Sequence, residues 1–273
     1  MSRVLAAVAQ SDFKNKEVWL NEARFGFEYI RPFCKDLGDD SAVLEVGCGS
    51  GILLGMLSEA DPGFDFEGIE PFGEGFEHLS DLNALLKASG LLIHDVGFEE
   101  FVAPRKYNLI YSVNVFEHLP DWRKFLTFIE QHLANNGVCV ILCPNYNVPY
   151  ESHFRIPILF NKQITARVFR KFIASYEEEN DVPGLWRSLN FVKLSQVRKE
   201  IAHTGLALKI HNNITEDLID RIATDDEFRR RQRVVGWLGS MLKKVGLLNL
   251  LKMRSFQNLQ PYMMLEIRLS NRA

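Results

Sequence analysis

Side chains that could remove a proton follow two strands predicted in this chain. The first strand is predicted at 107–113 and the second at 138–143. Histidine is the side chain whose unperturbed pKa lies closest to neutrality. We therefore place His153, after the second strand, first as a general base for a hydroxyl nucleophile. The alternatives are a structural or substrate-orienting role, or a surface position. The further candidates for a catalytic role are His118, Glu151 and Tyr150.

A glycine-rich loop forms the second group of residues that could take part in binding or chemistry. It reads Glu45-Val46-Gly47-Cys48-Gly49-Ser50-Gly51 and lies between a predicted strand and a predicted helix. Glycines permit a tight turn and close approach of the backbone to a ligand, and a helix that begins after the loop offers free N–H groups. Ile52 stands where the dinucleotide fingerprint requires its third glycine, and no Lys-Ser/Thr pair of a phosphate-binding loop follows.

Three acidic residues surround this loop, because each lies at the end of a predicted strand. They are Glu45, Glu70 and Asp95. Glu70 is placed to accept two ribose hydroxyls, Asp95 could accept from an adenine amino group, and Pro71 and Phe72 could cover the adenine face. Negative charge around the loop suits a cationic ligand and suits a pyrophosphate poorly.

These residues together resemble the class I S-adenosylmethionine-dependent methyltransferases, over about residues 40–145. The glycine loop matches the family's first motif, Glu70 its ribose-binding acid and Asp95 the acid that contacts adenine. Residues 112–119 (Ser-Val-Asn-Val-Phe-Glu-His-Leu) match the motif after the fourth strand in the small-molecule branch, which includes quinone-biosynthesis enzymes. In this family the position of His118 usually helps to order the cofactor pocket. The resemblance implies a cofactor site formed by Glu45, Gly47, Cys48, Gly49, Gly51, Glu70, Pro71, Phe72, Asp95, Val96, Asn114 and His118.

The elements that must position these residues alternate between strands and helices. Strands are predicted at 42–46, 66–70, 91–95, 107–113, 138–143, 206–214 and 262–269, and helices at 18–37, 52–58, 73–89, 122–133 and 194–203. Such alternation predicts an α/β fold with a mostly parallel sheet, whose strand-end loops share one edge. The resemblance implies a doubly wound seven-stranded sheet with an antiparallel last strand.

We expect a single methyltransferase domain over 1–273, with a helical cap at 1–40 and a cofactor-binding core at 41–145. Two inserts, near 145–190 and 215–260, are expected on the substrate side. The second contains 229–254, a segment with eight basic residues and no acidic one. It is either a lid or subunit contact with a basic rim, or a basic amphipathic element that touches an anionic membrane or an anionic substrate.

Composition narrows the possible partners. The 273 residues carry 32 Lys and Arg against 35 Asp and Glu, a net charge of −3, which argues against a nucleic-acid partner. The chain also lacks the Asn/Asp-Pro-Pro-aromatic motif of enzymes that methylate nucleic-acid amines. His94 and Asp95 are adjacent but have no matching set of ligands, so no metal site is expected. The four cysteines form no C-x-x-C pair, which favours free thiols in the cytoplasm, and no transmembrane stretch is expected.

Taken together, these residues predict methyl transfer from S-adenosylmethionine to a small-molecule acceptor, at oxygen in preference to nitrogen or carbon. Two alternatives remain. One is a nicotinamide-dependent oxidoreductase, which Ile52 in the glycine loop disfavours. The other is a non-catalytic module that binds a partner or a membrane and keeps a vestigial cofactor pocket. The identity of the acceptor and the oligomeric state stay open.

Overall fold

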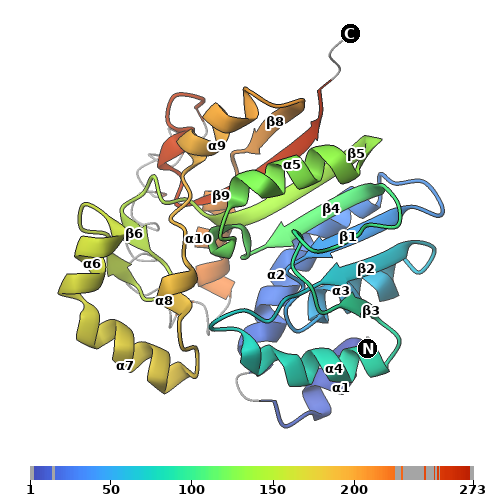
Figure 1. Ribbon diagram of the computed structural model, residues 1–273, viewed down its shortest axis with the longest axis horizontal. Helices are drawn as coiled ribbons and strands as arrows, with labels where there is room; N and C mark the ends of the chain where they lie inside the picture. The colour runs from blue at the N-terminus through green and yellow to red at the C-terminus, as the bar shows by residue number, and fades with distance from the viewer. Residues whose placement is uncertain are drawn as a thin grey trace.

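A seven-stranded sheet in the order β3-β2-β1-β4-β5-β9-β8 forms the centre of the computed structural model (Figure 1). The structure describes residues 3–13, 16–224, 229, 243, 249, 251 and 253–270. The strands, in sheet order, are β3 (Leu92–His94), β2 (Asp65–Ile69), β1 (Ala42–Val46), β4 (Tyr107–Val113), β5 (Leu133–Pro144), β9 (Tyr262–Leu269) and β8 (Leu206–His211). The first five are parallel, and β9 runs antiparallel to both of its neighbours. The predicted mostly parallel sheet with an antiparallel last strand is therefore confirmed.

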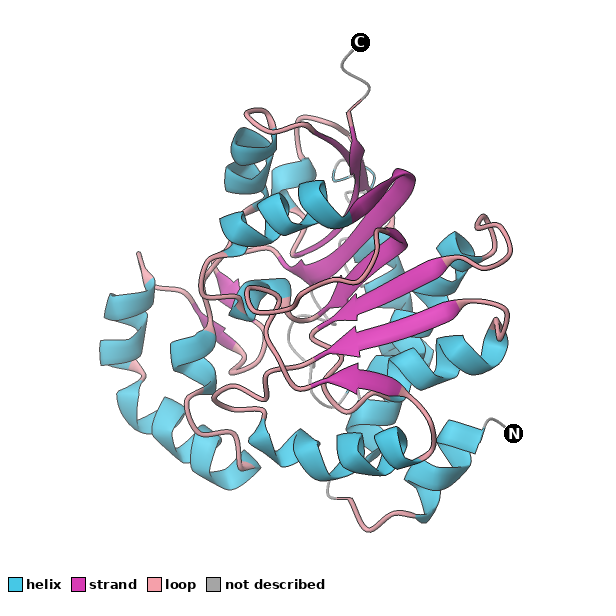
Figure 2. Cartoon of the chain, turned by 45° about the vertical axis from the view of Figure 1, so that its right-hand side comes forward, coloured by secondary structure: helices cyan, strands magenta, loops and turns pink. Residues whose placement is uncertain are grey.

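Helices cover both faces of the sheet, as Figure 2 shows. One face packs against α1 (Arg3–Gln10), α2 (Lys16–Cys34), α3 (Ile52–Ala60), α4 (Ser80–Ala88) and α10 (Ile214–Thr224). The other face packs against α5 (Trp122–His132) and α9 (Leu194–Ile201). The central strands are buried on both faces, so their sequences are almost continuously apolar. Because helices bury both faces of the sheet, the architecture is a doubly wound α/β fold.

The insert after β5 lies beyond the carboxyl ends of the parallel strands, where all of their arrows point (Figure 1). It contains a short hairpin and three helices with a core of their own that includes Phe154, Trp186 and Leu189. These elements are β6 (Tyr150–Glu151), β7 (Ile156–Pro157), α6 (Lys162–Val168), α7 (Arg170–Asn180) and α8 (Leu185–Ser188). The insert thus stands over the edge of the sheet at which ligands of such folds bind.

Several predicted elements have other bounds in the structure; for example, the strand predicted at 138–143 begins at Leu133. The strand predicted at 206–214 ends at His211. Ile214 instead begins α10, because the apolar residues of 214–224 recur at helical spacing and Ile214 packs against the sheet. The helix predicted at 73–89 begins only at Ser80, after a short 3-10 turn at Glu77–Leu79. Gly75 adopts a φ of 87°, a left-handed conformation that a right-handed helix does not contain.

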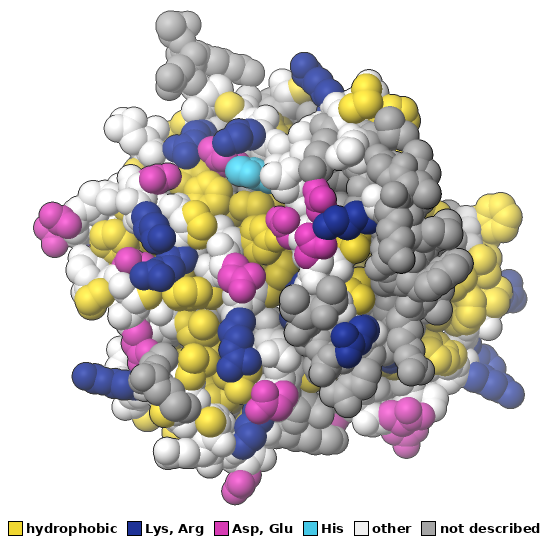
Figure 3. Space-filling view, turned by 180° about the vertical axis from the view of Figure 1, so that it is seen from behind, with side chains coloured by type: hydrophobic (Ala, Val, Ile, Leu, Met, Phe, Trp, Pro, Cys, Tyr) yellow, Lys and Arg dark blue, Asp and Glu magenta, His cyan; other side chains and the backbone are white. Residues whose placement is uncertain are grey.

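Charges of both signs lie side by side on the face seen from behind in Figure 3. The basic segment 229–254 lies almost entirely outside the described residues. Its described cations are Arg229, Lys243 and Arg254, and the Nζ atom of Lys243 lies 2.5 Å from Oδ1 of Asp220 on α10. The four cysteines are buried and free, as predicted. Among the described residues, none of the helices combines the length and the apolar character that crossing a membrane requires.

An acidic side chain on β9 yields a prediction about stability. Burial alone would raise the pKa of Glu266, but hydrogen bonds from Lys209, His211 and Arg268 outweigh it and lower the pKa to about 2. Its ionised form therefore stabilises the fold above the pKa of an unfolded glutamate, and this contribution is lost as the pH falls toward 2. We predict that Glu266→Gln lowers the free energy of unfolding by ~1 kcal/mol at pH 7, since the partners are partly exposed.

Urea unfolding of both proteins between pH 7 and pH 3 checks this expectation. The difference between the two should shrink as the pH falls below about 4, because the wild type then loses the charge that the variant lacks. Glu99→Gln, at an exposed position, serves as the control. Equal stability of wild type and Glu266→Gln at pH 7 would contradict the prediction.

Candidate active site

The glycine loop joins β1 to α3 and adopts a backbone that only glycine accommodates easily. Gly47, Gly49 and Gly51 have φ values of 75°, 50° and 81°. A Cβ atom at Gly47 would lie 2.4 Å from Cγ1 of Val115, which belongs to the segment after β4. The loop therefore packs directly against the chain that carries the next group of functional residues.

Glu70 fastens this loop to the end of β2. Its Oε2 accepts the backbone N–H of Gly49 at 2.8 Å, and its Oε1 accepts that of Phe72 at 2.9 Å. The residue is only 7% exposed, and burial raises the pKa of its carboxyl. Each carboxylate oxygen keeps a second lone pair, so Glu70 can still accept ribose hydroxyls. The residue fits the predicted cofactor role.

The other predicted cofactor residues have different environments. Asp95, directly after β3, has a side chain that is 60% exposed, and its Oδ1 lies 2.5 Å from Nζ of Lys87. Glu45 is buried inside β1 and accepts a hydrogen bond from the hydroxyl of Tyr111 at 3.0 Å. Burial raises the pKa of Glu45 as well. Glu45 thus interacts with the neighbouring strand β4, whereas Asp95 is accessible to a ligand.

Two more predicted cofactor positions have a strained backbone. Phe72 and Asn114 have φ values of 48° and 56°, in the left-handed region. The amide Oδ1 of Asn114 accepts a hydrogen bond from the hydroxyl of Tyr262 at 2.6 Å, and its Nδ2 donates to Glu22 at 3.4 Å. The segment after β4 is therefore held by β9 and by α2. Pro71 is exposed, and Val96 is half-buried against the core.

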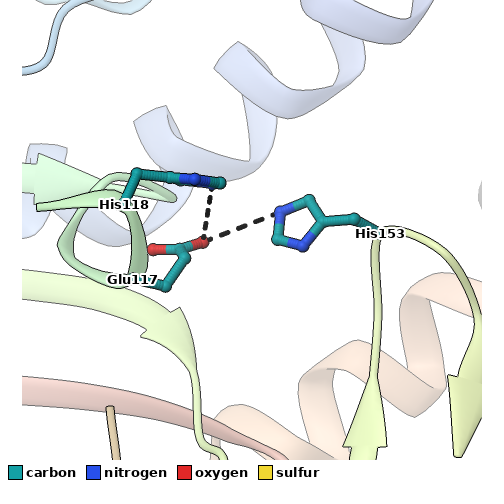
Figure 4. A group of neighbouring side chains, drawn as sticks. All are labelled: Glu117, His118 and His153. Carbon is teal, nitrogen blue, oxygen red and sulfur yellow. Dashed lines mark ion pairs between the residues drawn. The ribbon is translucent and has the colours of Figure 1, made fainter. Parts of the chain in front are cut away.

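A buried carboxylate and two histidines form a second cluster beside the glycine loop. Glu117 and His118 lie on the 3-10 turn Phe116–His118 after β4, and His153 comes from the hairpin of the insert (Figure 4). The Oε1 atom of Glu117 lies 3.9 Å from Nε2 of His118 and 3.9 Å from Nε2 of His153. Glu117 is fully buried, and neither of its oxygens has a hydrogen-bond partner in the described structure.

The orientation of both imidazoles is set through Nδ1. Nδ1 of His153 lies 2.7 Å from Oε1 of Glu151, and Nδ1 of His118 lies 2.8 Å from Oγ of Ser188. The Ser188 hydroxyl donates its proton to the carbonyl of Leu185, so its oxygen accepts from His118. Both Nε2 atoms are left to face Glu117, as Figure 4 shows.

Burial and neighbouring charges shift the pKa values of the cluster. Burial raises the pKa of Glu117 to about 7, although His153 partly opposes it. Burial lowers the pKa of His118 well below its usual range. For His153, burial alone would lower the pKa, but the charge and hydrogen bond of Glu151 outweigh it and raise the pKa. An imidazole with a lowered pKa, one with a raised pKa and a carboxyl that titrates near neutrality thus meet in one place.

The weaker catalytic candidates lie around this cluster in other roles. Glu151 is buried and accepts hydrogen bonds from the Tyr146 hydroxyl at 3.1 Å and from the backbone N–H of Phe154 at 2.6 Å, in addition to those from His153. It therefore orients His153. Tyr150 pairs with Pro157 across the hairpin and is half-buried.

Sequence reasoning did not single out Glu117 or Ser188. For Glu117 a signal was present, because it is an acidic residue shortly after a parallel strand, like Glu70 and Asp95. For Ser188 no sequence signal exists, since its contact with His118 depends on how the insert folds back over the sheet.

Comparisons with known proteins agree with this geometry. A family model described as a methyltransferase domain matches residues 20–196. An uncharacterized protein of Mycobacterium tuberculosis (strain H37Rv) is 36% identical over 230 residues, which cover 81% of this chain and 77% of that protein. A ubiquinone biosynthesis O-methyltransferase of Rickettsia canadensis is 28% identical over 178 residues, 64% of this chain and 66% of that protein.

Solved structures share the fold. The O-methyltransferase of a trans-AT PKS multienzyme of Brevibacillus brevis, in complex with S-adenosyl-L-homocysteine, superposes with a TM-score of 0.54 at 12% identity. The alignment covers all (100%) of this chain and 80% of that one. These findings favour neither a nicotinamide-dependent oxidoreductase nor a non-catalytic module. The chain belongs to the methyltransferase-domain family, and it is an S-adenosylmethionine-dependent methyltransferase.

Proposed function

We propose that this methyltransferase transfers the methyl group to a hydroxyl oxygen of a small-molecule acceptor. The observation that carries the proposal is the cluster of buried Glu117 with half-buried His118 and His153, on and near the turn whose Val115 packs against the glycine loop. A hydroxyl must lose its proton to become a good nucleophile, whereas a neutral amine need not. Similarity to enzymes named as O-methyltransferases supports the same choice of acceptor atom.

The cofactor half of the proposed site comprises the glycine loop and the ends of β2 and β3. S-adenosylmethionine supplies a methyl group attached to a positively charged sulfur. We assign the ribose hydroxyls to Glu70 and the adenine amino group to Asp95, with Pro71 and Phe72 beside the adenine ring. The burial of Glu70 keeps water away from these hydrogen bonds, which strengthens them.

The acceptor half of the proposed site comprises the 3-10 turn after β4 and the insert after β5. His153 is the residue that we assign to the acceptor hydroxyl, because Glu151 fixes its Nδ1 and leaves its Nε2 toward the cluster. The inserts at 145–190 and 215–260 line the acceptor pocket in this proposal. Within the second, 229–254 would contact an anionic acceptor or an anionic membrane. Buried free thiols favour action in the cytoplasm.

A test of the cofactor assignment uses Glu70→Ala. We expect its affinity for S-adenosylhomocysteine to fall about tenfold or more, because hydrogen bonds to a charged group are lost. Asp95→Ala should weaken binding less, since that side chain is exposed. Isothermal titration calorimetry measures both, and Asp65→Ala, at the opposite end of β2, is the matched control. Wild-type affinity in both variants, or no binding by the wild type, would disprove the assignment.

A test of the acceptor assignment uses His153→Ala. Turnover should fall about 100-fold or more, the usual contribution of proton transfer, while the affinity for S-adenosylhomocysteine stays unchanged. Release of S-adenosylhomocysteine with a panel of phenolic and amine acceptors provides the measurement. His132→Ala, on α5 and bonded to its own helix, is the control. Normal turnover of the variant removes His153 from the role, and methylation of amines alone refutes O-methylation.

A further inference from the structure

Three protein atoms in the proposed acceptor site converge as ligands of a metal ion would. They are a carboxylate oxygen of Glu117 and the Nε2 atoms of His118 and His153, and all lie within 4.8 Å of one another. We propose that this cluster binds one divalent transition-metal cation of the zinc type. Two imidazole nitrogens and one carboxylate oxygen suit Zn²⁺, Co²⁺ or Mn²⁺, whereas Ca²⁺ and Mg²⁺ prefer oxygen ligands alone.

The spacing of the three groups is close to what such a cation requires. Ligand atoms at about 2.0–2.2 Å from a tetrahedral zinc are about 3.3–3.6 Å apart. The two separations from Glu117 Oε1 are both 3.9 Å. The ligand nitrogens of the two imidazoles lie within 4.8 Å of each other. Side-chain rotations of up to ~1 Å would bring the three atoms to bonding distance without refolding of the hairpin that carries His153.

Both histidines have the outer partners that metal-binding histidines use. A histidine ligand donates its other ring N–H to a carboxylate or another oxygen, which fixes the ring and the tautomer. Here the acceptors are Glu151 for His153 and Ser188 for His118. Glu151 is fixed in turn by Tyr146 and by backbone N–H groups of its own hairpin. For His118, a ring proton on Nδ1 toward Ser188 leaves Nε2 facing Glu117 and the cluster.

Glu117 supplies the second, independent observation. Its two oxygens are fully buried and have no hydrogen-bond partner in the described structure. Buried polar groups nearly always have a partner, and an unpaired buried charge is costly. A cation between the carboxylate and the two imidazoles satisfies the carboxylate and the unprotonated Nε2 together. The competing arrangement, a charged His153 opposite Glu117, leaves their atoms 3.9 Å apart, too far for a hydrogen bond.

This proposal revises the sequence-based expectation that the chain has no metal site. That expectation rested on the adjacent pair His94–Asp95, which has no matching ligands nearby in the sequence. The three converging residues instead come from the turn after β4 and from the insert. Where it concerns the acceptor, the inference rests on the proposed O-methylation. Three protein ligands leave at least one coordination position open, at which a hydroxyl of the acceptor could bind and lose its proton to water more readily. With the cation bound, Nε2 of His153 would be a ligand, so His153 would act on the hydroxyl through the cation and not as its direct base.

Zinc titration of the untagged protein, stripped of metal with a chelator and free of cofactor and acceptor, tests the site directly. We expect calorimetry to show one strong equivalent of Zn²⁺ per chain. Glu117→Gln and His153→Ala should each weaken this binding about 100-fold or more, and Ser188→Ala about tenfold, since outer partners contribute less than ligands. His211→Ala removes a histidine of β8 that is paired with Glu266 of β9, and it should leave Zn²⁺ binding unchanged.

X-ray absorption of the zinc-loaded wild type needs no variant to fold and gives an independent readout. We expect two imidazole nitrogens and oxygen ligands at about 2.0–2.2 Å. No Zn²⁺ binding by the wild type, binding that the variants leave unchanged, or a spectrum without two imidazoles would each overturn the proposal. Because neither measurement involves an acceptor, failure of the metal site and failure of O-methylation give different results.

Discussion

The two hydrogen bonds that Glu70 accepts determine how the cofactor half of the site is built. They tie the N–H group of Gly49, in the loop after β1, to that of Phe72, in the loop after β2. The parallel pairing of β1 with β2 places these two loops at one edge of the sheet. The buried carboxylate of Glu70 holds both loops in place and still offers free lone pairs, as the proposed contact with the ribose hydroxyls requires.

The acceptor half of the proposed site is organised around Glu117, whose situation is the opposite of that of Glu70. This carboxylate is buried as deeply as any in the chain, yet the described structure gives it no hydrogen bond. The carboxylate of Glu70 already accepts two backbone hydrogen bonds and can bind a ligand in addition. The carboxylate of Glu117 would find its partner only in an acceptor or a cation. Gly47 packs closely against Val115, so in the proposed site the same packed loops would orient the methyl donor and the acceptor oxygen.

Much of the fold was predictable from sequence, because strands buried on both faces are continuously apolar and are separated by loops and amphipathic helices. The cofactor loop was predictable as well, since its left-handed backbone demands glycine. The helix beginning at Ile214 was not, because the alternating pattern of Leu206, Leu208 and Ile210 was extended past Asn212 and Asn213 to the next apolar residue.

The acceptor site was predictable only residue by residue. His118 and His153 were singled out, but their approach to Glu117 depends on the packing of the insert, whose periodicity does not encode where it folds back. From sequence, Glu70 and Asp95 were likewise both predicted as cofactor-binding acids at strand ends, with nothing to distinguish their environments. The structure separates them, since one carboxylate is buried between backbone N–H groups and the other is exposed and paired with Lys87.

A crystal structure with bound S-adenosylhomocysteine tests the central claim most directly, through the distance from its sulfur to Nε2 of His153. In-line transfer places a methyl group and a hydroxyl oxygen between these atoms, so the account predicts a distance of about 7 Å or less. It also predicts ribose hydroxyls within hydrogen-bond reach of Glu70. A sulfur that points away from Glu117 and His153, or is walled off from them by side chains, would contradict the account.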